Sequence, residues 1–136
     1  MSSDVNSQEI LNKIFFTQYK PLYLIGEGSF GKCFKGINLQ NNEDVCFKIE
    51  KKSQKSFLKI ESIALERLKG GKGIPVFYLF GYSDSFNILI MELLEKTIEN
   101  IFEKNNKKFS IKTVAILSIQ LVSKYFFIEN FKILVK

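Results

Sequence analysis

Arginine and cysteine are scarce in this sequence. Of the 136 residues, one is an arginine, Arg67, and two are cysteines, Cys33 and Cys46. So few cysteines indicate free thiols in a reducing, intracellular setting, the cytoplasm or alternatively the nucleus. The net charge of +6 is carried almost entirely by lysine. The aromatic residues fall at strand or helix periods and not within a basic stripe, so we expect solvated surface lysines and no nucleic acid as a partner.

Long apolar runs are also missing. No stretch has 18 consecutive apolar residues, and the first ten residues, MSSDVNSQEI, lack the apolar centre of a signal peptide. These absences predict no transmembrane helix and no membrane partner. What is present is a globular composition, with 46% hydrophobic and 25% charged residues. The length suits one ordinary domain.

The periodicity of the apolar residues predicts an α+β fold. We expect a polar tail over 1–18 that is loose apart from a short helix from Glu9 to Phe16. Five antiparallel strands are expected over 19–25, 32–37, 45–50, 76–82 and 86–91. A helix that Ser56 caps and Gly70-Gly71 ends falls after the third strand. Two more helices follow, one capped by Thr97 and one running from the cap Ser110 to about Ile128.

The glycine-rich run from Gly26 to Cys33 admits three interpretations. Its G-x-G-x-x-G spacing fits a dinucleotide fingerprint, and Gly26, Gly31 and Lys32 fit the spacing of a phosphate-binding P-loop. Both motifs must open a helix, whereas the residues that follow here read as a strand. Cys33 also stands where a P-loop needs Ser or Thr for Mg²⁺. We therefore discount these two interpretations.

The third interpretation is the glycine-rich hairpin of protein kinases, which lies over a triphosphate. It requires a strand on each side and a lysine on the next strand, and Lys48 stands there. That lysine needs an acidic partner from the following helix. Glu61, 13 residues beyond Lys48, suits this role, and Glu66 is the rival nearer the helix end. A single glutamate is more commonly a solvated residue on a helix face.

Six segments then occur in order, and together they resemble the casein kinase I family of serine/threonine protein kinases over about 19–127. They are IGEGSFG (25–31), EDVCFK (43–48), IES (60–62), GGKGIP (70–75), MELL (91–94) and FSIKTV (109–114). The GGKGIP run is more specific for that family than the glycine loop, which most kinases share. The resemblance implies a kinase amino-terminal lobe and hinge over 19–94 and the start of an incomplete carboxy-terminal lobe over 95–136.

The resemblance also implies the roles of individual residues toward ATP. The loop residues would cover the nucleotide; they are Ile25, Gly26, Glu27, Gly28, Ser29, Phe30, Gly31, Lys32 and Cys33. Lys48 would hold its phosphates and Glu61 would pair with Lys48. Met91 resembles the residue at the back of the adenine pocket, with Glu92 and Leu94 in the hinge. Ile25, Leu94 and Cys33 would sandwich the base. The sequence departs from the family at Cys33, at Cys46 and at Glu95-Lys96.

The residues that perform phosphoryl transfer in kinases are missing from this sequence. It has no histidine and no aspartate beyond Asp84, so it contains neither an H-R-D nor a D-F-G motif. The family's Mg²⁺ ligands are absent, and no catalytic or metal-binding residue is assigned. We therefore expect a truncated, inactive ATP-binding fragment of a casein kinase I-like enzyme. The alternative is a non-catalytic kinase-derived module, and protein substrates or a partner kinase are the expected protein partners.

Overall fold

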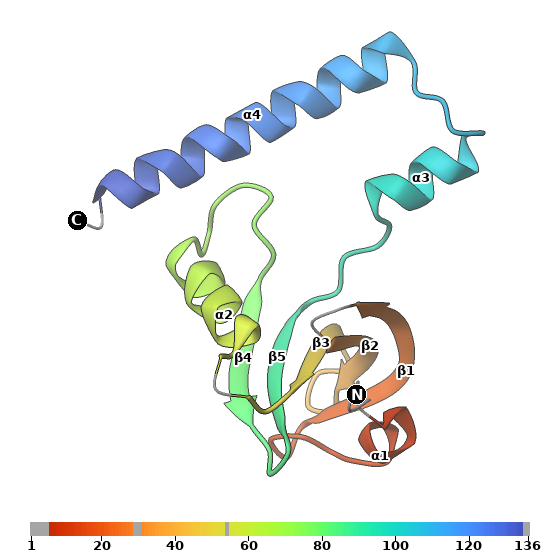
Figure 1. Cartoon of the computed structure of the whole chain (residues 1–136), viewed down its shortest axis with the longest axis vertical. Coiled ribbons are helices and arrows are strands. Elements are labelled where there is room, and N and C mark those ends of the chain that lie inside the picture. Colours follow the sequence, from red (N-terminus) through yellow and green to blue (C-terminus); the bar gives the residue numbers. More distant parts are fainter. Residues whose placement is uncertain (1–5, 29–30, 54, 135–136) are drawn as a thin grey trace. The chain divides into compact units, whose positions relative to one another are not determined.

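Figure 1 shows a computed structural model of the chain, which describes residues 6–28, 31–53 and 55–134. The chain forms two compact units. The first comprises Met1–Lys69 and Pro75–Leu93, and the second comprises Gly70–Ile74 and Leu94–Lys136. Each unit is described by itself below.

A five-stranded antiparallel sheet makes up most of the first unit, with strand order β1-β2-β3-β5-β4. The strands are β1 (Tyr19–Gly28), β2 (Gly31–Asn38), β3 (Asp44–Lys51), β4 (Phe77–Tyr82) and β5 (Phe86–Glu92). The helix α2 (Phe57–Arg67) lies between β3 and β4 in the sequence. The predicted fold class, a kinase-like sheet with one inserted helix and two helices after it, is therefore confirmed.

The central strands β3 and β5 are buried on both faces of the sheet, because their side chains alternate between two apolar clusters. Val45, Phe47 and Ile49 of β3 belong to the larger cluster, together with Ile88 and Ile90 of β5. The smaller cluster contains Cys46 of β3, Leu89 and Met91 of β5, and Leu58 of α2. Successive strand residues point to opposite faces, which explains why β3 and β5 are buried almost throughout.

The amino-terminal segment contributes to the larger cluster. Ile10 and Phe15 are 0% and 5% exposed, so this segment is not the loose tail that we expected. The helix α1 (Ser7–Leu11) is shorter than the predicted Glu9–Phe16 and begins earlier. Phe16 and Thr17 have φ angles of 51° and 65°, which lie in the left-handed region and cannot continue a right-handed helix.

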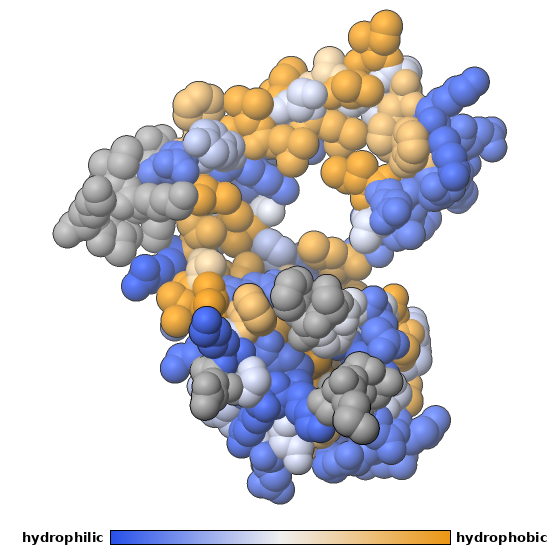
Figure 2. Space-filling model, viewed as in Figure 1, coloured by the Kyte–Doolittle hydropathy of each residue, from blue (hydrophilic) through white to orange (hydrophobic). Residues whose placement is uncertain are grey.

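The second unit contains α3 (Ile98–Lys104) and α4 (Ile111–Leu134). Thr97 caps α3 in a reciprocal arrangement with Asn100, and the Ser110 hydroxyl accepts from the Thr113 amide at 3.1 Å. Both predicted caps are thus confirmed, while α4 continues past the predicted end at Ile128. Figure 2 shows apolar side chains gathered along α4.

The residues Ile111–Glu129 of α4 are long and apolar enough to cross a membrane, although no unbroken apolar run is present. None of this window is buried. Length and composition alone do not indicate a membrane, so the expectation of no transmembrane helix stays a prediction.

Candidate functional site

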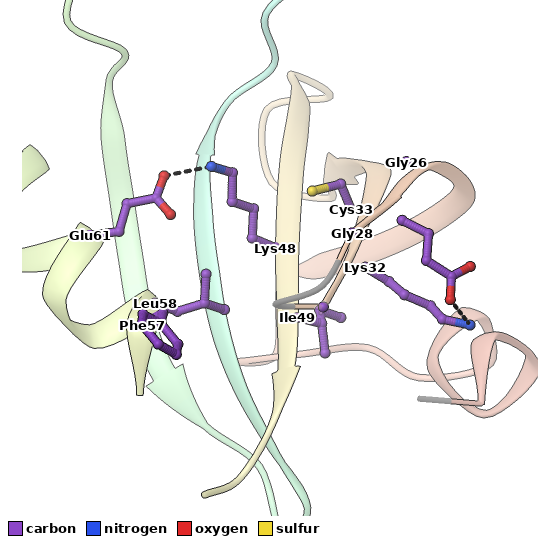
Figure 3. Close-up of a pocket in the computed structure, with 11 residues that line it drawn as sticks. Gly26, Gly28, Lys32, Cys33, Lys48, Ile49, Phe57, Leu58 and Glu61 are labelled. Carbon is purple, nitrogen blue, oxygen red and sulfur yellow. Dashed lines mark hydrogen bonds and ion pairs between the residues drawn. The ribbon is translucent and has the colours of Figure 1, made fainter. Parts of the chain in front are cut away.

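A cavity of about 410 Å³ lies in the first unit, between the β1–β2 hairpin, β3 and α2 (Figure 3). Its lining comes from three separate segments of the chain. They are Gly26, Glu27, Gly28, Gly31, Lys32 and Cys33 of the hairpin, Lys48 and Ile49 of β3, and Phe57, Leu58 and Glu61 of α2. The cavity is therefore built from the glycine-rich run, the lysine strand and the helix that the sequence singled out.

Lys48 and Glu61 meet in this cavity. The Lys48 ammonium nitrogen lies 2.5 Å from Glu61 Oε1, and the two side chains are 31% and 36% exposed. Figure 3 shows the lysine extending from β3 toward the carboxylate on α2. The predicted pairing is thus present in the structure. Glu66, the rival candidate, is exposed near the end of α2.

The position of Glu61 depends on how the start of α2 is fixed to the sheet. The Ser56 hydroxyl caps the helix by accepting from the Lys59 amide at 3.0 Å, and it donates to the buried carboxylate of Glu50. Glu50 also accepts from the side-chain amide of Asn87 at 2.9 Å and from the Leu58 amide at 3.4 Å. Because Glu50 is two residues beyond Lys48 on β3, this cluster ties the helix that carries Glu61 to the strand that carries Lys48.

The hairpin over the cavity is held by pairing that continues to its tip, where Gly28 faces Gly31. Gly31 has a φ of 142°, and a Cβ atom there would lie 2.2 Å from the carbonyl oxygen of Ile49. Only glycine permits this close approach of β2 to β3. The predicted nucleotide contacts Ser29 and Phe30 lie outside the described residues.

Lys32 forms a second ion pair in the cavity. Its ammonium lies 3.4 Å from Glu27 Oε1 across the hairpin and 3.4 Å from the hydroxyl of Ser7. Both Lys32 and Glu27 line the cavity. The two lysines of the site are thus each compensated by a carboxylate from a neighbouring segment.

The two cysteines lie close to Lys48. Cys33 faces Lys48 across the β2–β3 ladder, while Cys46 lies two residues before Lys48 on the same face of β3. A hydrogen bond from Cys46 and the charge of Lys48 lower the pKa of the Cys33 thiol from 9.0 to about 7, against an opposing effect of burial. The same hydrogen bond, together with burial, raises the pKa of Cys46.

Of the residues predicted to surround adenine, Cys33 lines this cavity, whereas Ile25, Met91, Glu92 and Leu94 do not. Met91 is 5% exposed and packs in the smaller core cluster, and Ile25 is 47% exposed on β1. The Glu92 amide donates to the carbonyl of Val76 at 2.8 Å, and its carboxylate accepts from the Val76 amide at 3.0 Å. Leu94 belongs to the second unit, where it begins the segment Leu94–Lys136. The roles of these four residues toward adenine stay predictions.

Three lining residues were missed by the sequence reasoning: Ile49, Phe57 and Leu58. Ile49 follows Lys48 directly, and Phe57 and Leu58 are the first residues after the Ser56 cap. The predicted cap could have identified Phe57 and Leu58, because an N-cap determines which residues form the first turn of the helix. Here that first turn lines the cavity.

Within 6–28, 31–53 and 55–134, no group of three or more His, Cys, Asp or Glu side chains could hold a metal ion. The two carboxylates of the cavity, Glu27 and Glu61, both pair with lysines. The residues present therefore do not fit a Mg²⁺ site by themselves.

Comparison with known proteins gives the family. No family model matches the chain. Casein kinase I homologs 3 and 2 of Schizosaccharomyces pombe are 40% and 44% identical to it over 101 residues, which is 74% of this chain and 23% of each relative. Casein kinase I homolog RAG8 of Kluyveromyces lactis is 42% identical over 106 residues, 77% of this chain and 20% of the relative. The chain thus spans less than a quarter of the length of these relatives, and over that shared segment it belongs to the casein kinase I family.

Proposed function

We propose that the cavity binds the phosphate groups of ATP, as the nucleotide site of a casein kinase I-type serine/threonine kinase. One observation carries the proposal: the Lys48–Glu61 ion pair of 2.5 Å lies in a cavity bounded by a glycine-rich hairpin. A lysine ammonium is a compact positive charge suited to phosphate oxygens. Glu61 would hold it in place before the nucleotide arrives.

The hairpin supports the same proposal from the other side of the cavity. Gly26, Gly28 and Gly31 carry no side chains, so backbone amides can approach a phosphate without a Cβ clash. Lys32 adds a second ammonium to the wall, bound to Glu27. The family reaction is the transfer of the terminal phosphoryl group of ATP to a serine or threonine hydroxyl of a protein, and the proposed site corresponds to the nucleotide site of that reaction.

These 136 residues would bind nucleotide without transferring its phosphoryl group. Phosphoryl transfer depends on metal ions that neutralise developing charge and on a carboxylate that accepts the proton of the attacking hydroxyl. The sequence has no aspartate beyond Asp84. The same observation favours the second candidate function, a binding module without catalysis. A radiolabelled-phosphate assay tests the lack of catalysis that both candidates share: turnover of the chain above that of a Lys48→Met variant would contradict both.

A titration of thermal stability tests the phosphate site. A ligand that binds only the folded chain at 100 times its Kd stabilises it by about 2.7 kcal/mol. We expect ATP and ADP to raise the unfolding temperature and adenosine to raise it much less, because Lys48 and the hairpin contact phosphates. Equal shifts with ATP and adenosine would contradict a phosphate cradle, and no shift with any of the three would contradict nucleotide binding.

A further inference from the structure

We propose that Cys33 is a covalent modification site, whose thiolate exchanges with low-molecular-weight disulfides to place a mixed disulfide inside the cavity. Cys33 is one of the residues that line the cavity, and it is only partly buried. Figure 3 shows its sulfur directed toward the strand that carries Lys48. A group attached there would occupy the space next to the Lys48 ammonium.

Three neighbouring groups set the reactivity of Cys33. On β3, Lys48 lies directly opposite and Cys46 lies two residues earlier on the same face. On α2, the nearest charge is Glu61, which is already paired with Lys48. On β1, the partner of Cys33 is Gly26, which brings no charge. The attractive groups outweigh Glu61, and they hold the pKa of Cys33 at about 7, where a large part of the thiol is ionised at neutral pH.

Cys46 promotes the reaction of Cys33 and is not itself a target of the reagent. It is 8% exposed and does not line the cavity, so a reagent cannot reach its sulfur directly. Its interaction with Cys33, together with burial, raises its own pKa. Diagonal neighbours on antiparallel strands have Cα atoms about 7–8 Å apart, whereas a disulfide needs about 4.4–6.8 Å. This general spacing of diagonal pairs disfavours an internal disulfide.

The reaction balances without a further oxidant. The Cys33 thiolate attacks one sulfur of the small disulfide, and a new S–S bond forms as the bond within the reagent breaks. The other half of the reagent leaves as a thiolate, which takes a proton from water. The modification adds one reagent half per chain and is reversed by an excess of free thiol.

An aromatic disulfide that releases a coloured thiolate tests the proposal on the full chain. We expect one fast equivalent per chain, and mass spectrometry of peptides should place it on Cys33. A Cys33→Ser variant should lose the fast phase. Fast labelling of Cys46, or a Cys33–Cys46 disulfide recognised by the loss of two hydrogens, would overturn the proposal.

The pH dependence of the rate tests the role of the thiol pair. The rate should rise with pH around a midpoint near 7, because the thiolate and not the thiol reacts. Removing the donor in Cys46→Ala should move the pH midpoint of the rate upward toward 9.0. The midpoint of Cys46→Ser, which keeps a donor, should lie between that of the unmodified chain and that of Cys46→Ala. An unchanged midpoint in Cys46→Ala would overturn the assisted mechanism.

A group attached to Cys33 should also block the binding of ATP. This effect rests on the proposed nucleotide site and is measured separately. ATP should slow the labelling of Cys33, and labelled chain should no longer be stabilised by ATP. If the labelling and its pH dependence hold but ATP neither slows the reaction nor stabilises the unlabelled chain, the nucleotide proposal fails and the modification site stands. If labelled chain still binds ATP, the blocking effect is overturned.

Discussion

At the scale of single residues, two glycines of one hairpin have opposite surroundings. Gly31 has a φ of 142° and would place a Cβ 2.2 Å from the Ile49 carbonyl oxygen, whereas a Cβ on Gly28 would meet nothing within 4 Å. The clash at Gly31 is with backbone, which cannot turn aside as a long side chain can. The hairpin thus packs closely against β3 at Gly31, whereas Gly28 has free space around the position of a Cβ atom.

This difference predicts unequal costs of adding one methyl group. Gly31→Ala should lower the free energy of unfolding by about 1–3 kcal/mol, since the strained conformation must be kept or β2 must move away from β3. Gly28→Ala is the matched control and should change it by less than about 0.5 kcal/mol. Urea unfolding measures both variants, and equal effects would contradict the described contact.

The pairing of Lys48 with Glu61 could be predicted from the sequence, because a kinase-type glycine-rich hairpin requires a lysine on the next strand and an acidic partner on the helix that follows. The adenine-facing roles of Ile25, Met91, Glu92 and Leu94 could not be derived from periodicity. Core packing and nucleotide contact give the same apolar pattern, and Met91 is found in the core cluster. Cys33 was identified as a departure from the family, but its reactivity depends on Cys46 and Lys48 across the ladder.

At the scale of elements, the start of α2 determines the site. Ser56 both caps the helix and donates its hydroxyl hydrogen to Glu50, whose other donors are N–H groups of Leu58 and Asn87. Glu50 is 5% exposed, so losing one donor leaves part of its carboxylate unsatisfied. The cap therefore acts on the sheet as well as on the helix.

We expect Ser56→Ala to destabilise the chain by about 1–2 kcal/mol, the usual cost of losing a capping side chain. It should also weaken ATP binding although Ser56 does not line the cavity, because Glu61 loses its fixed position. Ser53→Ala is the control, since the exposed Ser53 hydroxyl donates to the Lys55 carbonyl and not to Glu50. Denaturant unfolding and an ATP titration check the two effects; a stable variant with normal affinity would contradict this role.

The elements themselves were predictable where the sequence carries capping residues and strict periods. The caps at Ser56, Thr97 and Ser110 were all recognised, and so was every strand. The amino-terminal segment was not, because its apolar residues are few and irregularly spaced. Ile10 and Phe15 are ordered by the larger core cluster, a tertiary effect that local pattern does not contain.

At the scale of the whole molecule, α4 carries more exposed apolar surface than a stable monomer usually shows. Eight of its large apolar side chains are more than 45% exposed, namely Ile111, Val114, Ile116, Ile119, Leu121, Val122, Tyr125 and Phe126. An apolar surface of this kind lowers its free energy by association.

We expect light scattering to show a mean mass that rises with the concentration of the chain. Ile119→Glu combined with Val122→Glu should shift the chain toward monomer, because charge replaces apolar area at positions 66% and 52% exposed. Gln120→Glu with Ser123→Glu adds the same charge to the same helix and leaves the apolar side chains, so it should have less effect. A clean monomer of the unmodified chain at every concentration would refute this expectation.

The central claim is that Lys48, held by Glu61, binds nucleotide phosphate. Calorimetric titration of the full chain with ATP tests it most directly, with Lys51→Met as the control for removing an exposed lysine from the same strand. We predict that Lys48→Met weakens binding at least about tenfold, which is about 1.4 kcal/mol, and that Lys51→Met leaves it within about twofold. Equal affinity of Lys48→Met and the unmodified chain would contradict the account.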